Sequence, residues 1–132
     1  MPLEWLDHVN IRTANLAALT DFYQRVLGLE PGPRPAFDFA GSWLYCGERA
    51  VVHLSETSRA LPVDGESRIN HFAFQARGYG AFLEVLARNG VDYRESNTPA
   101  GMRQVFFLDP DGNRIEVGFD PGSEPPGQAG GS

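Results

Sequence analysis

Several features that would narrow the function of this chain are scarce or absent. It has one cysteine, Cys46, so neither an internal disulfide nor a cysteine-based zinc site can form, and any metal ligands must be histidines and carboxylates. It contains no run of about 18 apolar residues, the length needed to cross a membrane. Its first residues lack the basic and then apolar order of a secretion signal, so we expect a cytoplasmic protein.

Positive charge is also scarce. The 132 residues include 11 Lys and Arg against 17 Asp and Glu, which gives a formal net charge of −6. A basic surface for nucleic acid or for an anionic membrane is therefore not expected. Hydrophobic residues make up 42% of the chain, which is enough for the packed core of one small domain.

The hydrophobic pattern predicts an α+β fold of two tandem βαβββ modules in one domain over residues 1–120. Module one, about residues 5–57, is expected to contain a helix over Leu16–Leu27, with Asn15 as N-cap and Gly28 as its end, and strands over 5–12, 36–46 and 50–56. Residues 29–35 are too rich in proline and glycine for a central strand. Module two, about 68–120, is expected to contain a helix over 79–89 and strands over 68–76, 91–96, 102–108 and 114–119. We expect a linker at 58–67 and a disordered tail at 121–132.

The two modules repeat one arrangement of chemically active residues. His71 lies 63 residues after His8, and Glu116 lies 63 residues after His53. The three histidines of the chain and one glutamate therefore occupy two equivalent positions in two copies of one unit.

These four residues are candidate metal ligands. A single histidine in a strand is more often structural, but all four are expected on the strand faces that point away from the helices, where a core has no need of them. Burial of Glu116 among strands costs several kcal/mol unless the carboxylate is paired or bound to a cation. Imidazole and carboxylate ligands suit Zn, Ni, Co, Mn or Fe(II), and ligand type alone does not choose among them.

Four segments carry a family resemblance. They are Leu6-Asp7-His8-Val9, Phe22–Leu29, Asn70–Phe74 and Phe107–Glu116. Together they resemble the vicinal oxygen chelate superfamily over about residues 5–119; this superfamily includes glyoxalase I, extradiol dioxygenases, and fosfomycin- and bleomycin-resistance proteins. The resemblance implies curved mixed sheets around a metal-binding cup, in which His8, His71 and Glu116 hold a divalent ion.

The resemblance gives His53 two possible roles. Glyoxalase-like members place a fourth metal ligand at this position, whereas extradiol dioxygenases place a catalytic acid–base histidine near it that does not bind the metal. An imidazole suits both roles, so both stay open. Many small members are dimers with sites shared between subunits, and we expect a homodimer here.

Cross-strand pairing predicts which residues line the cup. The turn at 109–113 places Phe106 opposite Glu116, and the repeat places Trp43 opposite His53. Alternation puts Phe37, Phe39 and Tyr45 on the face of Trp43, although core packing explains Phe37 and Phe39 equally well. The candidate substrate-binding residues are Trp43, Tyr45, Phe106, Asn10, Gln104 and Phe39. Arg12, Arg94, Arg103 and Arg114, with Asn10, either orient an anionic group or are solvated surface residues.

The function that these observations favour is that of a small metal-dependent enzyme of the glyoxalase type. The ion would chelate two neighbouring oxygens of a small-molecule substrate, and His53 would transfer a proton. One alternative is an Fe(II) extradiol-type dioxygenase that acts on a catechol-like substrate, which an aromatic wall would suit. The other is a non-catalytic protein that binds a drug, as bleomycin-resistance proteins do, and whose negative charge attracts cationic compounds.

Overall fold

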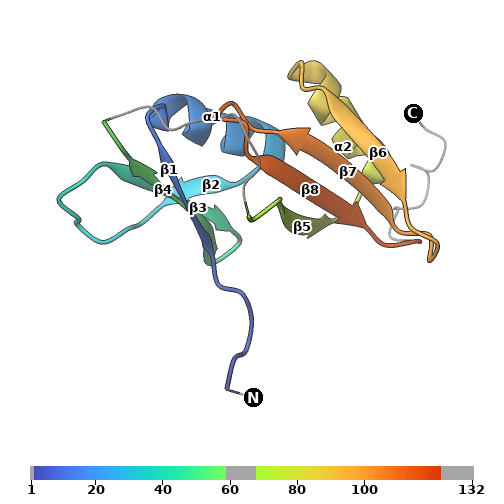
Figure 1. Ribbon diagram of the computed structural model, residues 1–132, viewed down its shortest axis with the longest axis horizontal. Coiled ribbons are helices and arrows are strands. Elements are labelled where there is room, and N and C mark those ends of the chain that lie inside the picture. The colour runs from blue at the N-terminus through green and yellow to red at the C-terminus, as the bar shows by residue number, and fades with distance from the viewer. Residues whose placement is uncertain (1, 59–67, 123–132) are drawn as a thin grey trace. The chain divides into compact units, whose positions relative to one another are not determined.

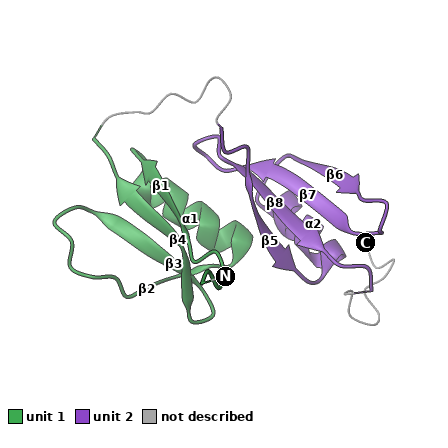
Figure 2. Cartoon of the chain, turned by 60° about the horizontal axis from the view of Figure 1, so that its bottom comes forward, with its two compact units in different colours: residues 1–63 green, residues 64–132 purple. Residues whose placement is uncertain are grey.

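The computed structural model describes residues 2–58 and 68–122. Residues 59–67 of the expected linker and 123–132 of the expected tail lie outside this range. The chain divides into two compact units, residues 1–63 and 64–132 (Figure 2). Among the described residues, no helix has the length and apolar character needed to cross a membrane.

Each unit is a βαβββ module with one four-stranded sheet and one helix (Figure 1). Unit 1 contains β1 (Val9–Thr13), α1 (Leu16–Leu27), β2 (Glu30–Gly32), β3 (Gly41–Cys46) and β4 (Arg49–Glu56), with sheet order β1-β4-β3-β2. Unit 2 contains β5 (Phe72–Ala76), α2 (Tyr79–Arg88), β6 (Tyr93–Asn97), β7 (Arg103–Leu108) and β8 (Arg114–Phe119), with sheet order β5-β8-β7-β6. The first strand of each unit runs parallel to the last and the other pairs are antiparallel, so both sheets are mixed. The predicted α+β fold with two tandem βαβββ modules is confirmed.

Each helix covers one face of its own sheet. In unit 1, Leu19, Tyr23 and Val26 of α1 are buried together with Leu44 and Val52 of the sheet. In unit 2, Leu86 of α2 is buried, as are Val105, Phe107, Ile115 and Val117 of β7 and β8. Because side chains alternate along a strand, the residues between these core positions point to the opposite face. That open face carries Trp43 and His53 in unit 1, and Phe106 and Glu116 in unit 2.

The helix ends agree in part with the sequence. Gly28 takes the left-handed conformation, with φ of 72°, and its N–H bonds back to Gln24, so it ends α1 as predicted. Asn15 stands at the N-cap of α1 but its side chain makes no capping hydrogen bond. Its backbone N–H instead donates to Oγ1 of Thr13 at 2.9 Å, so the chain enters the helix through a turn that the threonine side chain closes.

The strand predicted over residues 36–46 begins only at Gly41, which corrects the expected position of Phe37 and Phe39. Both lie in the loop between β2 and β3. Two prolines, Pro33 and Pro35, lack the N–H needed for a sheet ladder, and the N–H of Phe37 closes a turn onto the carbonyl of Pro35 at 2.9 Å. The proline- and glycine-rich stretch forms β2, and because β2 is an edge strand, this agrees with the exclusion of a central strand there.

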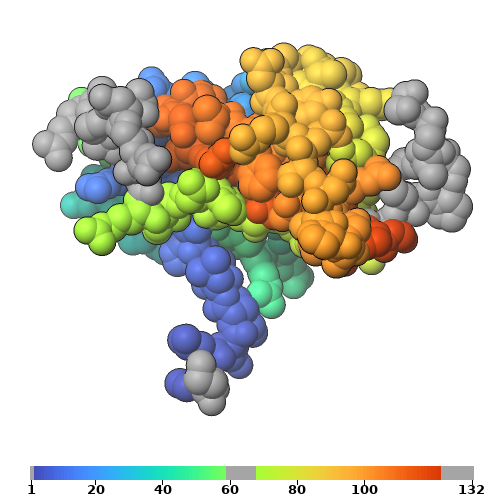
Figure 3. Space-filling model, turned by 45° about the vertical axis from the view of Figure 1, so that its right-hand side comes forward, coloured from blue at the N-terminus to red at the C-terminus, as the bar shows by residue number. Residues whose placement is uncertain are grey.

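The strands predicted over 5–12 and 68–76 also start later, at Val9 and Phe72. His8 and His71 therefore lie one residue before the paired segments β1 and β5. The segment before β1 extends away from the sheet of unit 1 (Figure 3), and its Leu3 and Leu6 are largely exposed. Alternation detects an extended chain, whereas a strand also needs a hydrogen-bonded neighbour.

The turn between β7 and β8 depends on one buried carboxylate. Oδ1 of Asp109 accepts the backbone N–H groups of Asp111 at 3.0 Å and Asn113 at 2.9 Å, and Oδ2 accepts Nδ2 of Asn113 at 2.9 Å. The turn sets the register of the hairpin that carries Phe106 and Glu116.

We expect Asp109→Ala to lower the free energy of unfolding by about 2 kcal/mol, because three hydrogen bonds to a buried charged acceptor are lost. Chemical denaturation followed by circular dichroism measures the change. Asp92→Ala, at an exposed position before β6, is the control and should leave the midpoint unchanged. Equal midpoints for the two variants would contradict the role of Asp109.

Candidate metal and catalytic site

In unit 1, the imidazole of His53 lies between two other rings. Its centroid is 3.9 Å from that of Trp43 and 3.7 Å from that of His8, and both ring pairs are within 12° of parallel. Trp43 on β3 is the cross-strand partner of His53 on β4, as the repeat predicted. The two neighbouring rings leave His53 only 8% exposed.

Backbone contact fixes the tautomer of His53. Nε2 lies 3.1 Å from the carbonyl oxygen of Ala50, so Nε2–H donates and Nδ1 keeps its lone pair. Loss of solvation on burial lowers the pKa of His53 below its ordinary value of 6.5, and proximity to the second imidazole, His8, lowers it further because the two rings would repel if both were protonated. The imidazole is therefore neutral at pH 7 with one basic nitrogen, as a proton acceptor requires.

The same pKa shift predicts how stability depends on pH. Because the pKa of His53 is lower in the folded chain, the unfolded chain binds more protons at pH values below about 6.5. The contribution of His53 to stability is fully present above that pH and decreases as the pH falls. Denaturation midpoints measured between about pH 5 and pH 8 should show this slope, and His53→Gln should reduce it. An unchanged slope in the variant would contradict the assignment.

The preceding residue orients the ring of His8. Nδ1 of His8 lies 2.7 Å from Oδ2 of Asp7, so Nδ1–H donates to the carboxylate and Nε2 keeps its lone pair. The hydrogen bond from His8 lowers the pKa of Asp7. Carboxylate partners of this kind fix the orientation of metal-binding histidines and raise their basicity.

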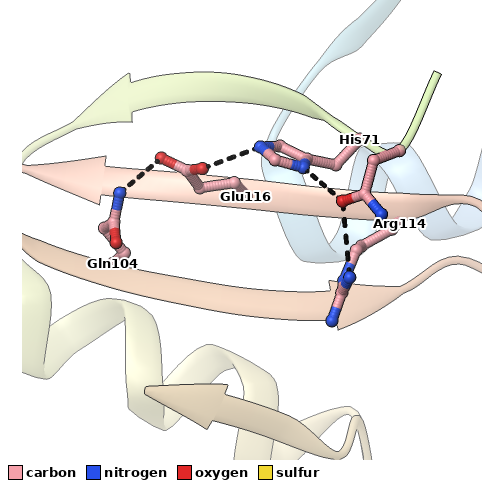
Figure 4. A network of polar contacts seen from close by, with 5 residues as sticks. His71, Gln104, Arg114 and Glu116 are labelled. Carbon is pink, nitrogen blue, oxygen red and sulfur yellow. Dashed lines mark hydrogen bonds and ion pairs between the residues drawn. The ribbon is translucent and has the colours of Figure 1, made fainter. Parts of the chain in front are cut away.

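Unit 2 repeats this arrangement with an amide in place of the carboxylate. Nδ1 of His71 lies 2.7 Å from Oδ1 of Asn70, so Nε2 of His71 also keeps its lone pair. That nitrogen lies 3.1 Å from Oε1 of Glu116 (Figure 4). Nε2 of Gln104 donates to the second oxygen, Oε2, at 3.3 Å, and Glu116 is only 14% exposed.

The contact between His71 and Glu116 needs a proton or a cation between its two atoms. With Nδ1–H given to Asn70, a neutral His71 presents a lone pair to a carboxylate oxygen 3.1 Å away, which places two acceptors face to face. A proton on Nε2 or a metal ion between the two atoms removes this repulsion. Two ligand atoms about 2.1 Å from one ion lie about 3.0 to 3.4 Å apart, for octahedral to tetrahedral angles. The spacing and the donor set therefore fit a divalent metal.

The predicted ligands are divided equally between the units. His8 and His53 belong to unit 1, and His71 and Glu116 belong to unit 2. Across residues 2–58 and 68–122, no three His, Cys, Asp or Glu side chains come together as a metal site. Neither unit by itself therefore contains the complete predicted set.

Stacking limits what His53 can bind together with His8. A metal ion lies in the plane of the imidazole that binds it, because the nitrogen lone pair lies in that plane. The rings of His8 and His53 are nearly parallel with centroids 3.7 Å apart, so an ion in the plane of one ring lies outside the plane of the other. In this conformation the two histidines cannot bind one ion together.

The candidate substrate-binding residues other than Trp43 and Gln104 make different kinds of contact. Phe106 is the cross-strand partner of Glu116, as predicted, and its ring contacts that of His71 edge to face at 5.6 Å. Asn10 bonds to Ser55 on the neighbouring strand, with 3.1 Å from Nδ2 to Oγ. The hydroxyl of Tyr45 donates to the carbonyl of Pro33, which ties its ring to the segment after β2.

Phe39 stacks on Phe37 at 5.0 Å, and the guanidinium of Arg34 lies over both rings at 5.3 and 5.0 Å. Phe37 also approaches Trp43 at 6.4 Å, so aromatic rings continue from the loop to His53. These contacts arise from the loop rather than from the predicted strand.

Sequence reasoning did not identify the roles of Asp7 and Asn70. The 63-residue shift that aligns His8 with His71 also aligns these two residues. A polar side chain directly before each histidine was the signal that could have revealed them.

Tandem βαβββ modules that carry histidine and carboxylate side chains at equivalent positions are typical of vicinal-oxygen-chelate proteins. The chain belongs to the Glyoxalase/Bleomycin resistance protein/Dioxygenase superfamily, whose sequence model matches residues 5–117. It is 32% identical over 120 residues to "Glyoxylase I 4" of Arabidopsis thaliana, a match that covers 85% of this chain and 68% of the relative.

Solved structures share the fold. A glyoxalase/dioxygenase from Nostoc punctiforme matches with a TM-score of 0.76 and 22% identity, covering 91% of this chain and 93% of the other. Lactoylglutathione lyase from Agrobacterium tumefaciens matches with a TM-score of 0.69 and 21% identity, covering 100% of both chains. The resemblance stated from the sequence is therefore confirmed at the level of family and fold.

Proposed function

We propose that this chain is a metal-dependent enzyme of the glyoxalase type. His8, His71 and Glu116 hold one divalent ion, Zn, Ni, Co, Mn or Fe(II), and the substrate is a small molecule with two neighbouring oxygens. Membership of the superfamily supports an enzymatic role, and the relative named glyoxylase I supports this branch of it.

The observation that carries the proposal is the contact between Nε2 of His71 and Oε1 of Glu116. The two atoms are 3.1 Å apart, and the hydrogen bond to Asn70 places the ring proton on the other nitrogen. His8 has its Nε2 available in the same way through Asp7. Both histidines are therefore oriented for metal binding before a metal arrives.

Each side chain of the proposed site would have a separate role in the reaction. A divalent ion held there would polarise two adjacent substrate oxygens and stabilise the negative charge that develops on them. His53, neutral and with Nδ1 available, would accept and return the proton. Gln104 would hold the carboxylate of Glu116 through Oε2 and leave Oε1 toward His71. Trp43 and Phe106 would form apolar walls for the substrate, and Tyr45, Phe39 and Asn10 are further candidate substrate contacts.

One observation favours an extradiol-type dioxygenase as the second candidate. The rings of Phe37, Trp43 and His53 follow one another in unit 1, at 6.4 and 3.9 Å, and would suit a flat catechol-like substrate. In that case the ion would be Fe(II), and His53 would act on the protons of the diol.

Assembly of the ligand set leads us to propose a homodimer with two equivalent sites. His8 belongs to unit 1, and the pair His71–Glu116 belongs to unit 2. The two units could meet within one chain, as a single domain over residues 1–120, or units of two chains could meet across a two-fold axis. We expect light scattering at micromolar concentration to give the mass of a dimer. A monomeric mass would contradict the dimer.

The first experiment is elemental mass spectrometry of untagged protein purified without chelator. Near-stoichiometric Zn, Ni, Co or Mn would support the glyoxalase type, and Fe would move the proposal to the dioxygenase and to a screen of catechols under oxygen. If the protein holds no metal and takes up none on addition, the proposal is wrong and drug binding without catalysis becomes the better hypothesis.

A further inference from the structure

The guanidinium groups of Arg94 and Arg114 both lie near the ring of Phe106, beside the candidate metal ligands of unit 2. Cζ of Arg94 lies 5.8 Å from the ring centroid of Phe106, and Cζ of Arg114 lies 5.6 Å from it. Phe106 on β7 is the direct partner of Arg94 on β6 and of Glu116 on β8. The two arginines therefore share the open face of this sheet with the ligand pair.

Neither arginine has an acidic partner within the described part of the chain. The ion pairs there are His8–Asp7, Arg25–Asp21 and His71–Glu116. All 11 basic residues of the chain are arginines, and the net charge is −6. Two arginines without carboxylate partners on one face of such a chain are a local concentration of positive charge.

Arg114 is also connected to the metal ligands. Its Nη1 donates to Oδ1 of Asn70 at 3.3 Å, and the same oxygen accepts Nδ1–H of His71 (Figure 4). One contact uses one of the five N–H donors of a guanidinium, which leaves others for a ligand. The side chain is thus held at the edge of the site with donors to spare.

We propose that Arg94 and Arg114 bind an oxyanion group of the substrate, a carboxylate or a phosphate, and that the substrate is therefore a small anion. The inference rests on the proposed function for its assignment to the substrate. The planar fork of a guanidinium matches the oxygens of both anions. Arg114 and Glu116 are two residues apart on one strand, about 7 Å, so the anionic group and the chelating oxygens would be only a few bonds apart.

Another arginine of the same sheet provides a matched control. Arg103 begins β7, but its guanidinium lies 4.6 Å from the ring of Tyr79, the first residue of α2. It therefore lies on the helix side of the sheet. Its replacement changes the net charge of the chain by the same amount as replacement of Arg94 or Arg114.

The test is calorimetric titration of the full chain with inorganic phosphate and with benzoate, first without metal and then after loading with Ni²⁺. We expect Arg94→Gln and Arg114→Gln each to weaken binding of the preferred anion about ten-fold or more, and Arg103→Gln to leave it unchanged. Preference for phosphate or for benzoate distinguishes a phosphate from a carboxylate substrate. Thermal unfolding of each variant checks that it is folded.

The outcomes separate this inference from the proposed function. Binding that depends on Arg94 and Arg114 in protein that takes up no metal would support the anion site and reject the metal. Metal uptake with no binding of either anion, or with equal loss in all three variants, would overturn the anion site alone.

Discussion

Replacement of His71 by alanine is expected to lower metal affinity by at least about 100-fold, because loss of an outer-shell partner alone typically costs 10- to 100-fold. Nε2 of His71 is the ring nitrogen that the hydrogen bond to Asn70 leaves for a metal, and it lies 3.1 Å from Oε1 of Glu116. Removal of the ring would take away one proposed ligand and the contact that orients the other, Glu116. Equilibrium dialysis against Zn²⁺ or Ni²⁺, followed by elemental analysis, measures the loss.

Two further variants sharpen this result. Glu116→Gln keeps the shape of the side chain and removes its charge, so it should also lose most of the affinity. Asn70→Ala keeps both candidate ligands and removes the partner of Nδ1, together with the contact to Arg114, so it should cost less, about 10-fold or somewhat more. Unchanged occupancy in His71→Ala would show that the ligand assignment is wrong, and it would leave a protonated His71 as the explanation of the contact with Glu116.

Replacement of His53 by glutamine is expected to reduce kcat by about 10²- to 10⁴-fold while metal content stays the same. Parallel stacking at 3.7 Å prevents His8 and His53 from binding one ion together, and the bond from Nε2–H to Ala50 leaves Nδ1 as the basic atom. The function of His53 would then be proton transfer. Turnover of the substrate found by the screen, together with metal analysis of the same sample, measures both quantities.

The Co²⁺-substituted protein separates the two roles of His53 without a substrate. Its visible absorption spectrum depends on which atoms bind the metal. If His53 is not a ligand, wild type and His53→Gln give the same spectrum; if it is the fourth ligand, the spectrum and the affinity both change. Cys46→Ser, an exposed position that no part of the proposal uses, is the control for handling of the protein.

Some features of the site could be predicted from the sequence because they depend on short-range geometry. Alternation along a strand places His53 and Glu116 opposite the core residues, and the length of the turn after Leu108 places Phe106 against Glu116. The repeat then transfers the same pairing to Trp43 and His53. The cross-strand partners and the βαβββ order were therefore predicted correctly.

Other features of the structure could not be predicted from the hydrophobic pattern of the sequence. The strand start at Gly41 depends on two prolines that end the ladder and on a loop that packs Arg34 against Phe37. A hydrophobic pattern records the character of side chains but does not record which backbone groups find a partner. Phe39 was therefore assigned to a strand and lies in a loop.

The sequence by itself determined the number of modules, the equivalence of the two pairs of candidate ligand positions and the sheet face of His53 and Glu116, because periodicity and turn length act over a few residues. Tertiary structure alone decided how the rings are oriented. Stacking of His53 on His8 joins residues 45 apart in the sequence, and the contacts of Arg94 and Arg114 with Phe106 join three strands. Such contacts depend on side-chain rotamers and on the approach of distant segments, which no local pattern encodes.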